Sequence, residues 1–426
     1  MRISVTTLGC KVNQYESRAL EEAFTRQGHQ LVPHDAAADV VVVNSCTVTH
    51  RSDRDVRALV RRARRQNPGA RIAVTGCYAQ VAPEELRALG VDLVVGTADK
   101  QRLPELLESG RGGVHVAEWG WAPALGPEPV TRFGGRARAF LKVQDGCEAF
   151  CAYCIVPHAR GPSRSLPLEE VVAGFARLHG AGYDEVVLTG VHLGNWGRDL
   201  DPPRSFTQLL DAAEAAGVAR VRLSSLEPGE VDAAVVGRLA ASPVFCPHLH
   251  VPLQAGSDRV LAAMGRPYTA AAFAAAVRRA ATAIPGLCLG CDVIVGFPGE
   301  GEAEFAATEH LLESLPVAYL HVFPFSARRG TSAWAMEPKV AAAVIKERAR
   351  RLRAWSKHRQ QQFWRTQVGT RAPALVEDSP REGWLRTRTR NYVPVAVPWE
   401  GPPPRGEIDV VINAVEASGT RGRVAP

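Results

Sequence analysis

The first hundred residues alternate short β-branched runs with stretches of helical periodicity. The runs are RISVTTLG (2–9), ADVVVVNS (38–45), ARIAVTG (70–76) and VDLVVGT (91–97), and each ends at turn-forming residues. Their apolar side chains fall on both faces, which is typical of buried parallel strands. We therefore predict a small doubly wound α/β domain over residues 1–110, followed by a Gly- and Pro-rich linker over residues 111–136.

The alternation resumes after the linker and continues to about residue 330. Six candidate strands stand between helical stretches: RAFLKVQ (138–144), EVVLTG (185–190), RVRLSS (220–225), HLHVPL (248–253), CLGCDVIVG (288–296) and AYLHVFPF (318–325). This order predicts a partial (β/α)6 barrel within a domain spanning residues 137–364. In such barrels the reactive groups lie on loops after the carboxyl ends of the strands.

The last segment, residues 365–426, has a different period. Its short alternating runs are separated by Gly and Pro turns: APALVED (372–378), WLRTRTR (384–390), YVPVAVP (392–398) and EIDVVINAVE (407–416). Period-two alternation in short runs predicts a small all-β barrel. The predicted architecture is α/β overall, with an N-terminal parallel sheet, a central partial barrel and a C-terminal β-barrel.

Composition changes this picture little. The chain has 426 residues, of which 46% are hydrophobic and 22% charged, as expected for a globular protein with two or three domains. No run reaches the roughly eighteen apolar residues of a membrane helix, and the N-terminus lacks the apolar region of a signal peptide. We expect a cytoplasmic protein without a membrane partner. The net charge of +7 is a weak indication of a polyanionic partner.

Three cysteines lie close together in DGCEAFCAYCIVP (145–157), directly after the first predicted barrel strand. Cys147, Cys151 and Cys154 offer soft thiolate ligands, which suit zinc or an iron–sulfur cluster. Zinc would need a fourth ligand, which His158 could supply. A four-iron cluster on three thiolates would instead leave one iron open to an external ligand, and the position at the catalytic face of the barrel favours this interpretation.

Three further cysteines each follow a predicted strand of the N-terminal sheet. Because parallel strands end at the same edge of a sheet, Cys10, Cys46 and Cys77 should converge there, and Gly9 and Gly76 would let the backbone approach a bulky ligand. A single buried cysteine commonly acts as a small hydrophobe. Three at equivalent points of successive units favour a second three-thiolate cluster. We expect buried, inert thiols at the other positions, which are Cys246, Cys288 and Cys291.

The spacing C-x3-C-x-aromatic-C, with Tyr153 as the aromatic residue, resembles the signature of the radical S-adenosylmethionine (SAM) superfamily. The resemblance implies a [4Fe-4S] cluster on Cys147, Cys151 and Cys154 whose open iron binds SAM. An electron from this cluster splits SAM to a 5′-deoxyadenosyl radical. By the same resemblance Tyr153 lies against the adenine of SAM.

Two three-thiolate sites together with such a barrel are similar to the methylthiotransferases. Blocks along nearly the whole chain carry the likeness, among them TLGCKVNQYES (7–17), NSCTVT (44–49), HLHVPLQAGSDRVLAAMGRPYT (248–269) and DVIVGFPGE (292–300). The C-terminal barrel resembles their TRAM domain, an OB-like module that binds RNA. The resemblance implies two [4Fe-4S] clusters and SAM as cofactors. It also implies hydrogen abstraction from C2 of an adenine, sulfur addition from the N-terminal cluster and methylation by a second SAM.

Loops after the barrel strands should hold SAM, and the C-terminal barrel should hold RNA. Gly190, in TGVHLGN, and the carboxylate of Glu227 are the candidates for SAM, while His192, His248 and His250 are expected to be packed or hydrogen-bonded rather than ligands. Arginines track phosphates and aromatic rings stack on bases. The RNA candidates recur with the period of a strand, for which a solvated strand face is the alternative: Arg386, Arg388, Arg390 and the nearby Tyr392.

The residues around the first cysteine bear on the substrate. GCKVNQ (9–14) resembles the branch that modifies N6-threonylcarbamoyladenosine at position 37 of tRNA, next to the anticodon. Related branches act on isopentenyladenosine in tRNA or on an aspartate of a ribosomal protein. A non-catalytic, zinc-bearing RNA-binding protein is the alternative from a different class. The expected partners are the anticodon loop of tRNA, a low-potential electron donor and a sulfur source.

Overall fold

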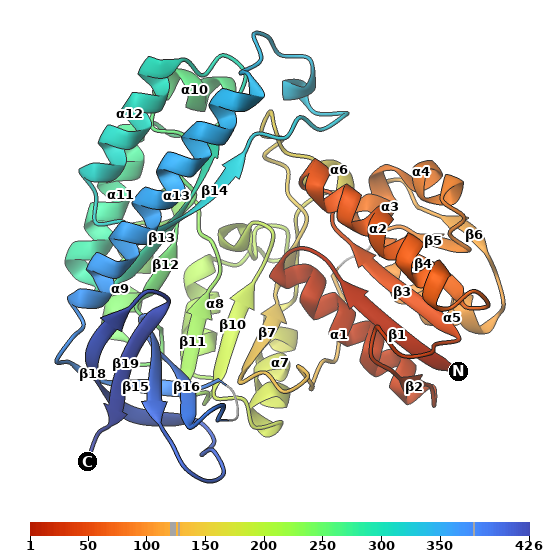
Figure 1. Ribbon diagram of the computed structural model, residues 1–426, viewed down its shortest axis with the longest axis horizontal. Coiled ribbons are helices and arrows are strands. Elements are labelled where there is room, and N and C mark those ends of the chain that lie inside the picture. Colours follow the sequence, from red (N-terminus) through yellow and green to blue (C-terminus); the bar gives the residue numbers. More distant parts are fainter. Residues whose placement is uncertain (120–124, 127, 378–379) are drawn as a thin grey trace.

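The computed structural model describes residues 1–119, 125–126, 128–377 and 380–426. Part of the predicted linker, residues 120–124 and 127, therefore lies outside the described residues. Three β-rich parts follow one another along the chain and lie side by side, as Figure 1 shows. None of the helices described there is long and apolar enough to cross a membrane.

The N-terminal part is a parallel sheet of six strands in the order β2-β1-β3-β4-β5-β6. The strands are β1 (Arg2–Thr7), β2 (Gln30–Leu31), β3 (Val40–Ser45), β4 (Arg71–Gly76), β5 (Leu93–Val95) and β6 (Gly113–His115). Apolar residues of α1 (Lys11–Arg26) and α5 (Leu103–Glu108) pack on one face. Those of α2 (His50–Gln66) and α4 (Pro83–Ala88) pack on the other. The predicted doubly wound sheet is confirmed, and it gains two short strands, β2 and β6.

The central part contains the six predicted barrel strands, all parallel. They are β7 (Arg138–Lys142), β10 (Glu185–Thr189), β11 (Arg220–Leu223), β12 (His248–His250), β13 (Cys288–Val295) and β14 (Tyr319–Pro324). Backbone bridges between Val221 and Phe245 and between Ser225 and His250 join two three-stranded sheets, β7-β10-β11 and β12-β13-β14. The partial barrel is open between β7 and β14, and α1 of the N-terminal part packs against β7.

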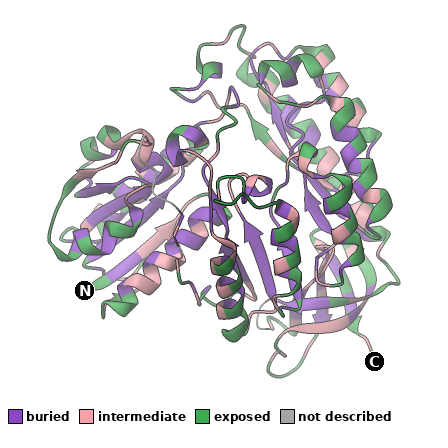
Figure 2. Ribbon diagram, turned by 180° about the vertical axis from the view of Figure 1, so that it is seen from behind, coloured by how far each residue is buried: buried purple, intermediate pink, exposed green. Residues whose placement is uncertain are grey.

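Helices cover the outside of the partial barrel. They are α7 (Leu168–Gly180), α8 (Phe206–Glu214), α9 (Ala233–Ala241), α11 (Ala270–Ala283), α12 (Glu302–Glu313) and α13 (Ala342–Arg365). The signals of α7 are local: Pro167 precedes it, Glu169 and Glu170 lie in its first turn, and Gly182 follows its end with φ of +85°. Figure 2 shows that the strands are buried, whereas the helices expose their outer faces.

The C-terminal part is a closed barrel with the strand order β15-β16-β17-β19-β18. Its strands are β15 (Arg371–Val376), β16 (Trp384–Thr389), β17 (Pro394–Pro398), β18 (Glu407–Glu416) and β19 (Gly419–Val424). The predicted small β-barrel is confirmed, with β19 as an additional strand. It docks on the central barrel through β11, because Arg220 and Arg222 donate hydrogen bonds to backbone carbonyls of Arg388, Thr389 and Arg390.

Candidate functional site

A cavity of 1630 Å³ lies where the three parts meet. The N-terminal sheet contributes the ends of β1, β3 and β4, the central barrel contributes inward-facing side chains of its strands, and the C-terminal barrel contributes Glu377, Arg388 and Tyr392. Ligand pockets for drug-sized molecules commonly measure roughly 300–1,000 Å³. The cavity is therefore large enough for more than one nucleoside-sized ligand.

Cys10, Cys46 and Cys77 all line this cavity as free thiols. They come from adjacent strand ends, because Thr7 is in register with Asn44 and Ser45 with Gly76. Cys10 precedes the first turn of α1, and Cys77 begins α3 (Cys77–Val81). Burial raises the pKa of Cys77 to about 12, and the neighbouring Cys46 and Cys10 thiols add to this effect. We call these three residues the sheet-edge triad.

Glycine is required beside two members of the sheet-edge triad. Gly9 has φ of +104°, and a Cβ atom there would lie 3.1 Å from the sulfur of Cys46. Gly76 has φ of +93°, and a Cβ atom there would lie 2.5 Å from the carbonyl oxygen of Ser45. Both positions therefore exclude a side chain, which leaves the space between the thiols open.

Cys147, Cys151 and Cys154 occupy the loop between β8 (Gln144–Asp145) and α6 (Val156–Arg160). We call these three free thiols the loop triad. The loop is fixed by backbone hydrogen bonds from Cys147 to Gly161 and from Cys154 to Cys151. Polar side chains also contact its sulfurs: His192 Nδ1 lies 3.8 Å from Cys147 Sγ, and Arg266 donates to Cys151 Sγ at 3.2 Å.

The spacing of the sulfur atoms separates the two metal alternatives. Tetrahedral zinc with Zn–S bonds of about 2.3 Å would place its thiolate sulfurs about 3.8 Å apart. All six thiols are described, and neither triad brings its three sulfurs within 4.8 Å of one another. His158 is exposed, and its ring lies 5.9 Å from that of Phe150. The donor sets therefore fit the corners of a four-iron cluster better than a single zinc ion.

The predicted SAM residues are divided between the cavity and its surroundings. Gly190 lines the cavity, and a Cβ atom there would lie 2.9 Å from Oε1 of Gln144. Glu227 forms an ion pair with Arg266, the residue that also contacts Cys151. Tyr153 is half-buried and packs with a small apolar cluster around Met264. Tyr153 and Glu227 are thus near the loop triad but outside the cavity lining.

A buried charge network joins the two triads, and no motif in the sequence indicates it. Arg160, at the end of α6, donates to Glu16 at 3.0 Å, to Asp145 at 2.8 Å and to Asn13. Lys100 and Lys142 also pair with Glu16. Burial alone would raise the pKa of Glu16, but these cations hold it well below its usual range. Since Asn13 and Glu16 belong to α1, the network fixes the sheet-edge triad relative to the loop triad.

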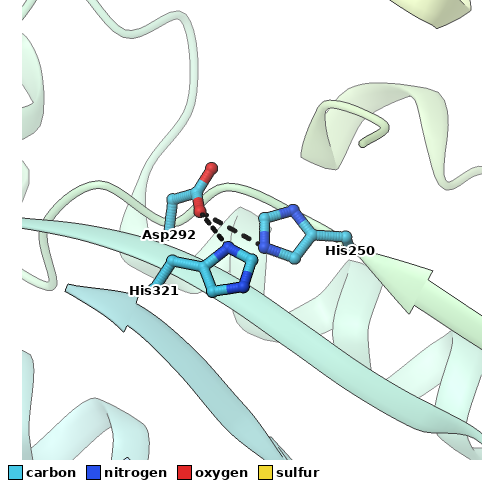
Figure 3. A group of neighbouring side chains, drawn as sticks. All are labelled: His250, Asp292 and His321. Carbon is cyan, nitrogen blue, oxygen red and sulfur yellow. Dashed lines mark ion pairs between the residues drawn. The ribbon is translucent and has the colours of Figure 1, made fainter. Parts of the chain in front are cut away.

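Two histidines and an aspartate line the wall of the cavity (Figure 3). His250 Nε2 and His321 Nδ1 lie 3.2 and 3.3 Å from the same oxygen of Asp292, and Ser225 contacts the other ring nitrogen of His250. Among the described residues these three have the spacing of metal ligands. Burial would raise the pKa of Asp292, but the two histidines hold it well below its usual value. His192 and His248 are hydrogen-bonded to Glu230 and Tyr319, respectively.

Three of the four predicted RNA-binding residues lie at the junction of the two barrels, namely Arg388, Arg390 and Tyr392. Arg386 is exposed, whereas Arg388 and Arg390 form ion pairs with Glu377 and Glu407. Tyr392 faces the cavity from the turn after β16. Arg388 and Tyr392 are thus brought together in the cavity, while Arg386 and Arg390 lie outside its lining. Contact of the four residues with RNA stays a prediction. Cys246, Cys288 and Cys291 are buried, as expected.

Comparison with known proteins gives two family matches. Residues 2–96 match the Uncharacterized protein family UPF0004, and residues 141–312 match the Radical SAM superfamily. The threonylcarbamoyladenosine tRNA methylthiotransferase MtaB of Bacillus subtilis is 40% identical, with 91% of this chain and 87% of the relative covered. The protein of the same name from Thermotoga maritima is 37% identical, with 92% and 90% covered.

A relative with a different name is also similar. The tRNA-2-methylthio-N(6)-dimethylallyladenosine synthase of Sphingopyxis alaskensis is 34% identical, with 89% of this chain and 88% of the relative covered. Among solved structures, the radical S-adenosylmethionine methyltransferase TsrM of Kitasatospora setae, with cobalamin and a [4Fe-4S] cluster bound, has a TM-score of 0.57. Its sequence identity is 15%, and 76% of this chain and 72% of that chain are covered. At this identity the likeness concerns the fold alone.

Proposed function

The chain belongs to the radical SAM methylthiotransferase family, and from this premise we propose that it adds a methylthio group to C2 of N6-threonylcarbamoyladenosine at position 37 of tRNA. Relatives named for threonylcarbamoyladenosine reach 37–40% identity, although two others are at 35% and 32%, and relatives named as dimethylallyladenosine synthases are at 31–34%. The higher values support this substrate. The observation that carries the proposal is the pair of free-thiol triads joined by Arg160, one of which lines a cavity large enough for a flipped nucleoside.

The loop triad would hold a [4Fe-4S] cluster that binds SAM, and the sheet-edge triad would hold a second [4Fe-4S] cluster. When bound, these groups supply the electron that cleaves SAM and the sulfur that replaces hydrogen at C2. Gly190, Tyr153 and Glu227 are the proposed SAM contacts. The target base would enter the cavity, whose lining comes from the N-terminal sheet, the central barrel and the C-terminal barrel.

Arg386, Arg388, Arg390 and Tyr392 are the proposed RNA contacts of the C-terminal barrel. The position of Arg388, Arg390 and Tyr392 at the junction of the barrels would let the anticodon loop of tRNA approach the cavity while one of its bases enters it. The reaction also needs a low-potential electron donor and a source that restores the sulfur. Because the substrate is tRNA, we propose the cytoplasm as its place of action.

Mass spectrometry of tRNA nucleosides tests the substrate. Deletion of the gene should remove 2-methylthio-N6-threonylcarbamoyladenosine from total tRNA, while its precursor accumulates. Re-expression of the wild-type chain should restore it, and a chain lacking the six thiols should not. An unchanged level of the modified nucleoside in the deletion strain would contradict the proposed substrate.

Metal analysis tests the class of protein. After anaerobic purification and reconstitution we expect about eight irons per chain and a brown protein, since each [4Fe-4S] cluster contains four irons. A colourless protein with about one zinc per chain would identify the zinc-bearing RNA-binding alternative instead. Loss of about half of the iron after substitution of either triad would show that the two sites are independent.

A further inference from the structure

One end of the cavity is strongly cationic. Its lining there comes from all three parts of the chain, and we call it the cationic floor: Lys11, Arg138, Arg222, Arg388 and Tyr392. Arg138 is the first residue of β7, Arg222 lies in β11, and Tyr392 follows β16. The floor is therefore near the amino ends of the barrel strands, where the C-terminal barrel closes the central one. The loop triad, by contrast, follows the carboxyl end of β7.

The guanidinium groups of the floor outnumber their carboxylate partners. Arg222 is bound by Glu185, at 2.8 and 3.1 Å. Arg138 and Arg388 share Glu377, at 2.9 and 2.7 Å. Glu185 also pairs with the buried Arg220, which has Glu407 as a second partner. Two carboxylates, Glu185 and Glu377, thus serve the three guanidinium groups of the floor. The floor keeps a net positive charge, and these ion pairs hold its arginines in fixed positions.

Lys11 is the cation of the floor without an anionic partner. Among the described residues it makes no hydrogen bond and no ion pair, although it follows Cys10 directly and begins α1. Its side chain is exposed to the cavity. The guanidinium groups of Arg138 and Arg222 line the same end of the cavity as its ammonium group. An ammonium group held beside two guanidinium groups in a cavity is unfavourable unless an anion joins them.

The ring of Tyr392 is surrounded by the arginines of the cationic floor. Its ring centre lies 4.5 Å from the guanidinium of Arg388, 4.9 Å from that of Arg222 and 5.6 Å from that of Arg138. The backbone of Tyr392 has φ of +70°, a conformation uncommon for a bulky residue. Burial alone would raise the pKa of Tyr392, but Arg138 and Arg388 lower it. The ring therefore forms a rigid, aromatic base to the floor that several cations surround.

We propose that the cationic floor binds the carboxylate of the threonylcarbamoyl group, with Lys11 as the residue that supplies the charge-assisted hydrogen bond. This inference rests on the proposed function and assigns its specificity to a named residue. The threonyl carboxylate is attached through N6 to the same six-membered ring that carries C2. The base can therefore present C2 inside the cavity lined by the sheet-edge triad while its N6 substituent reaches the floor.

The floor explains selectivity as well as affinity. An unmodified adenine or an apolar N6 substituent would cover Lys11 without supplying an anion, and a buried unpaired ammonium is costly. A backbone phosphate is the other anion that RNA offers. The floor lines the cavity that would receive the flipped base, so its cations, Arg388 included, would meet the base substituent. Arg386 and Arg390 lie outside the cavity lining and are left to contact the phosphates.

Binding of two matched RNAs tests the inference. The probes are an anticodon stem-loop with N6-threonylcarbamoyladenosine and the same stem-loop with its carboxylate as a methyl ester. Their dissociation constants are measured by fluorescence anisotropy at fixed salt with the reconstituted holoenzyme. The wild type should bind the acid roughly tenfold to a hundredfold more tightly, as one or two hydrogen bonds to a charged group would give. Equal affinities would overturn the inference without any variant being needed.

Variants then assign the effect to Lys11. Lys11→Met should bind the two RNAs alike, whereas Lys11→Arg should keep most of the preference. Lys357→Met removes an exposed cation of α13 outside the cavity and should keep the full preference. Because Lys11 adjoins Cys10, the iron content of each variant is matched to the wild type first. If Lys11→Met still prefers the acid as strongly as the wild type does, the assignment to Lys11 is wrong. If Lys11→Met loses affinity equally for the acid, the ester and unmodified RNA, the assignment is also wrong, and Lys11 contacts a phosphate instead.

The outcome is distinguishable from failure of the proposed function. If the wild type methylthiolates neither RNA under reducing conditions with SAM, the substrate proposal is wrong. If it methylthiolates both and binds them with equal affinity, the substrate class stands and only the role of the floor is wrong.

Discussion

The two thiol triads are built in opposite ways. The loop triad lies within eight consecutive residues, 147–154, and a single loop fixes it. The sheet-edge triad spans residues 10 to 77, and three parallel strands bring it together. The geometry of the loop triad depends on local turns, whereas that of the sheet-edge triad depends on the register of the sheet. The same ligand chemistry therefore depends on local sequence in one site and on tertiary structure in the other.

The two triads also differ in what they face. The sheet-edge triad lines the cavity, together with Gly190 and the cationic floor, whereas the loop triad lies behind the cavity lining, against Arg266 and His192. In the proposed reaction the first would meet the target base and the second would meet SAM. Separate roles should therefore be separable by mutation.

The largest expected effect comes from removing one thiol of each triad. Cys147→Ala should reduce formation of 5′-deoxyadenosine from SAM to the background rate, because the cluster that binds SAM loses a ligand. Cys10→Ala should keep SAM cleavage and lose the methylthiolated product. Both products are measured by liquid chromatography and mass spectrometry in one assay. Intact cleavage in Cys147→Ala, or loss of cleavage in Cys10→Ala with the loop cluster still loaded, would break the proposed division of roles.

A smaller effect should come from the network that joins the triads. Arg160→Met leaves Glu16 and Asp145 buried with less positive charge around them, and breaking a buried ion pair in this way commonly costs about 3–5 kcal/mol. We expect a clearly lower thermal transition temperature of the reconstituted protein. Arg238→Met is the matched control, because Arg238 and Asp211 form an exposed pair that contributes about 0–1 kcal/mol. Equal transition temperatures for the two variants would show that the network does not stabilise the junction.

Most of the strands could be predicted from the sequence because their signals are local. The runs VVVVNS and CLGCDVIV are long and apolar, and both are strands. The missed strand β19 reads GTRGRV and has little apolar content, so its pairing with β18 decides its conformation. Likewise β2 has two exposed residues, and only its place beside β1 makes it a strand.

The site was predictable where residue type alone suggests chemistry. Cysteines stand out in a sequence, and strand ends indicate where they converge. Glu16, Arg160 and Lys142 look like ordinary surface charges, and their interactions join positions more than a hundred residues apart, so only the fold reveals them. Arg388 and Arg390 are two residues apart, a spacing that predicts that both side chains lie on one exposed face of the strand. Docking of the C-terminal barrel on the central one instead gives them Glu377 and Glu407 as partners.

The smallest effect is expected from a pair of glycine variants that distinguishes a change of strand spacing in the N-terminal sheet from local backbone strain. Gly76→Ala places a methyl group 2.5 Å from the Ser45 carbonyl oxygen at φ of +93°, so β3 and β4 must move apart near Cys46 and Cys77. Gly28→Ala also has positive φ, +80°, but meets no atom within 4 Å. A positive φ at an alanine lowers the free energy of unfolding by about 1–3 kcal/mol in both variants. In Gly76→Ala the steric overlap lowers it by about another 1–3 kcal/mol. Iron analysis should show loss of up to half of the iron in Gly76→Ala alone, with SAM cleavage retained. If Gly76→Ala loads as much iron as Gly28→Ala, the sheet-edge triad tolerates a change of strand spacing and does not depend on register as the comparison requires.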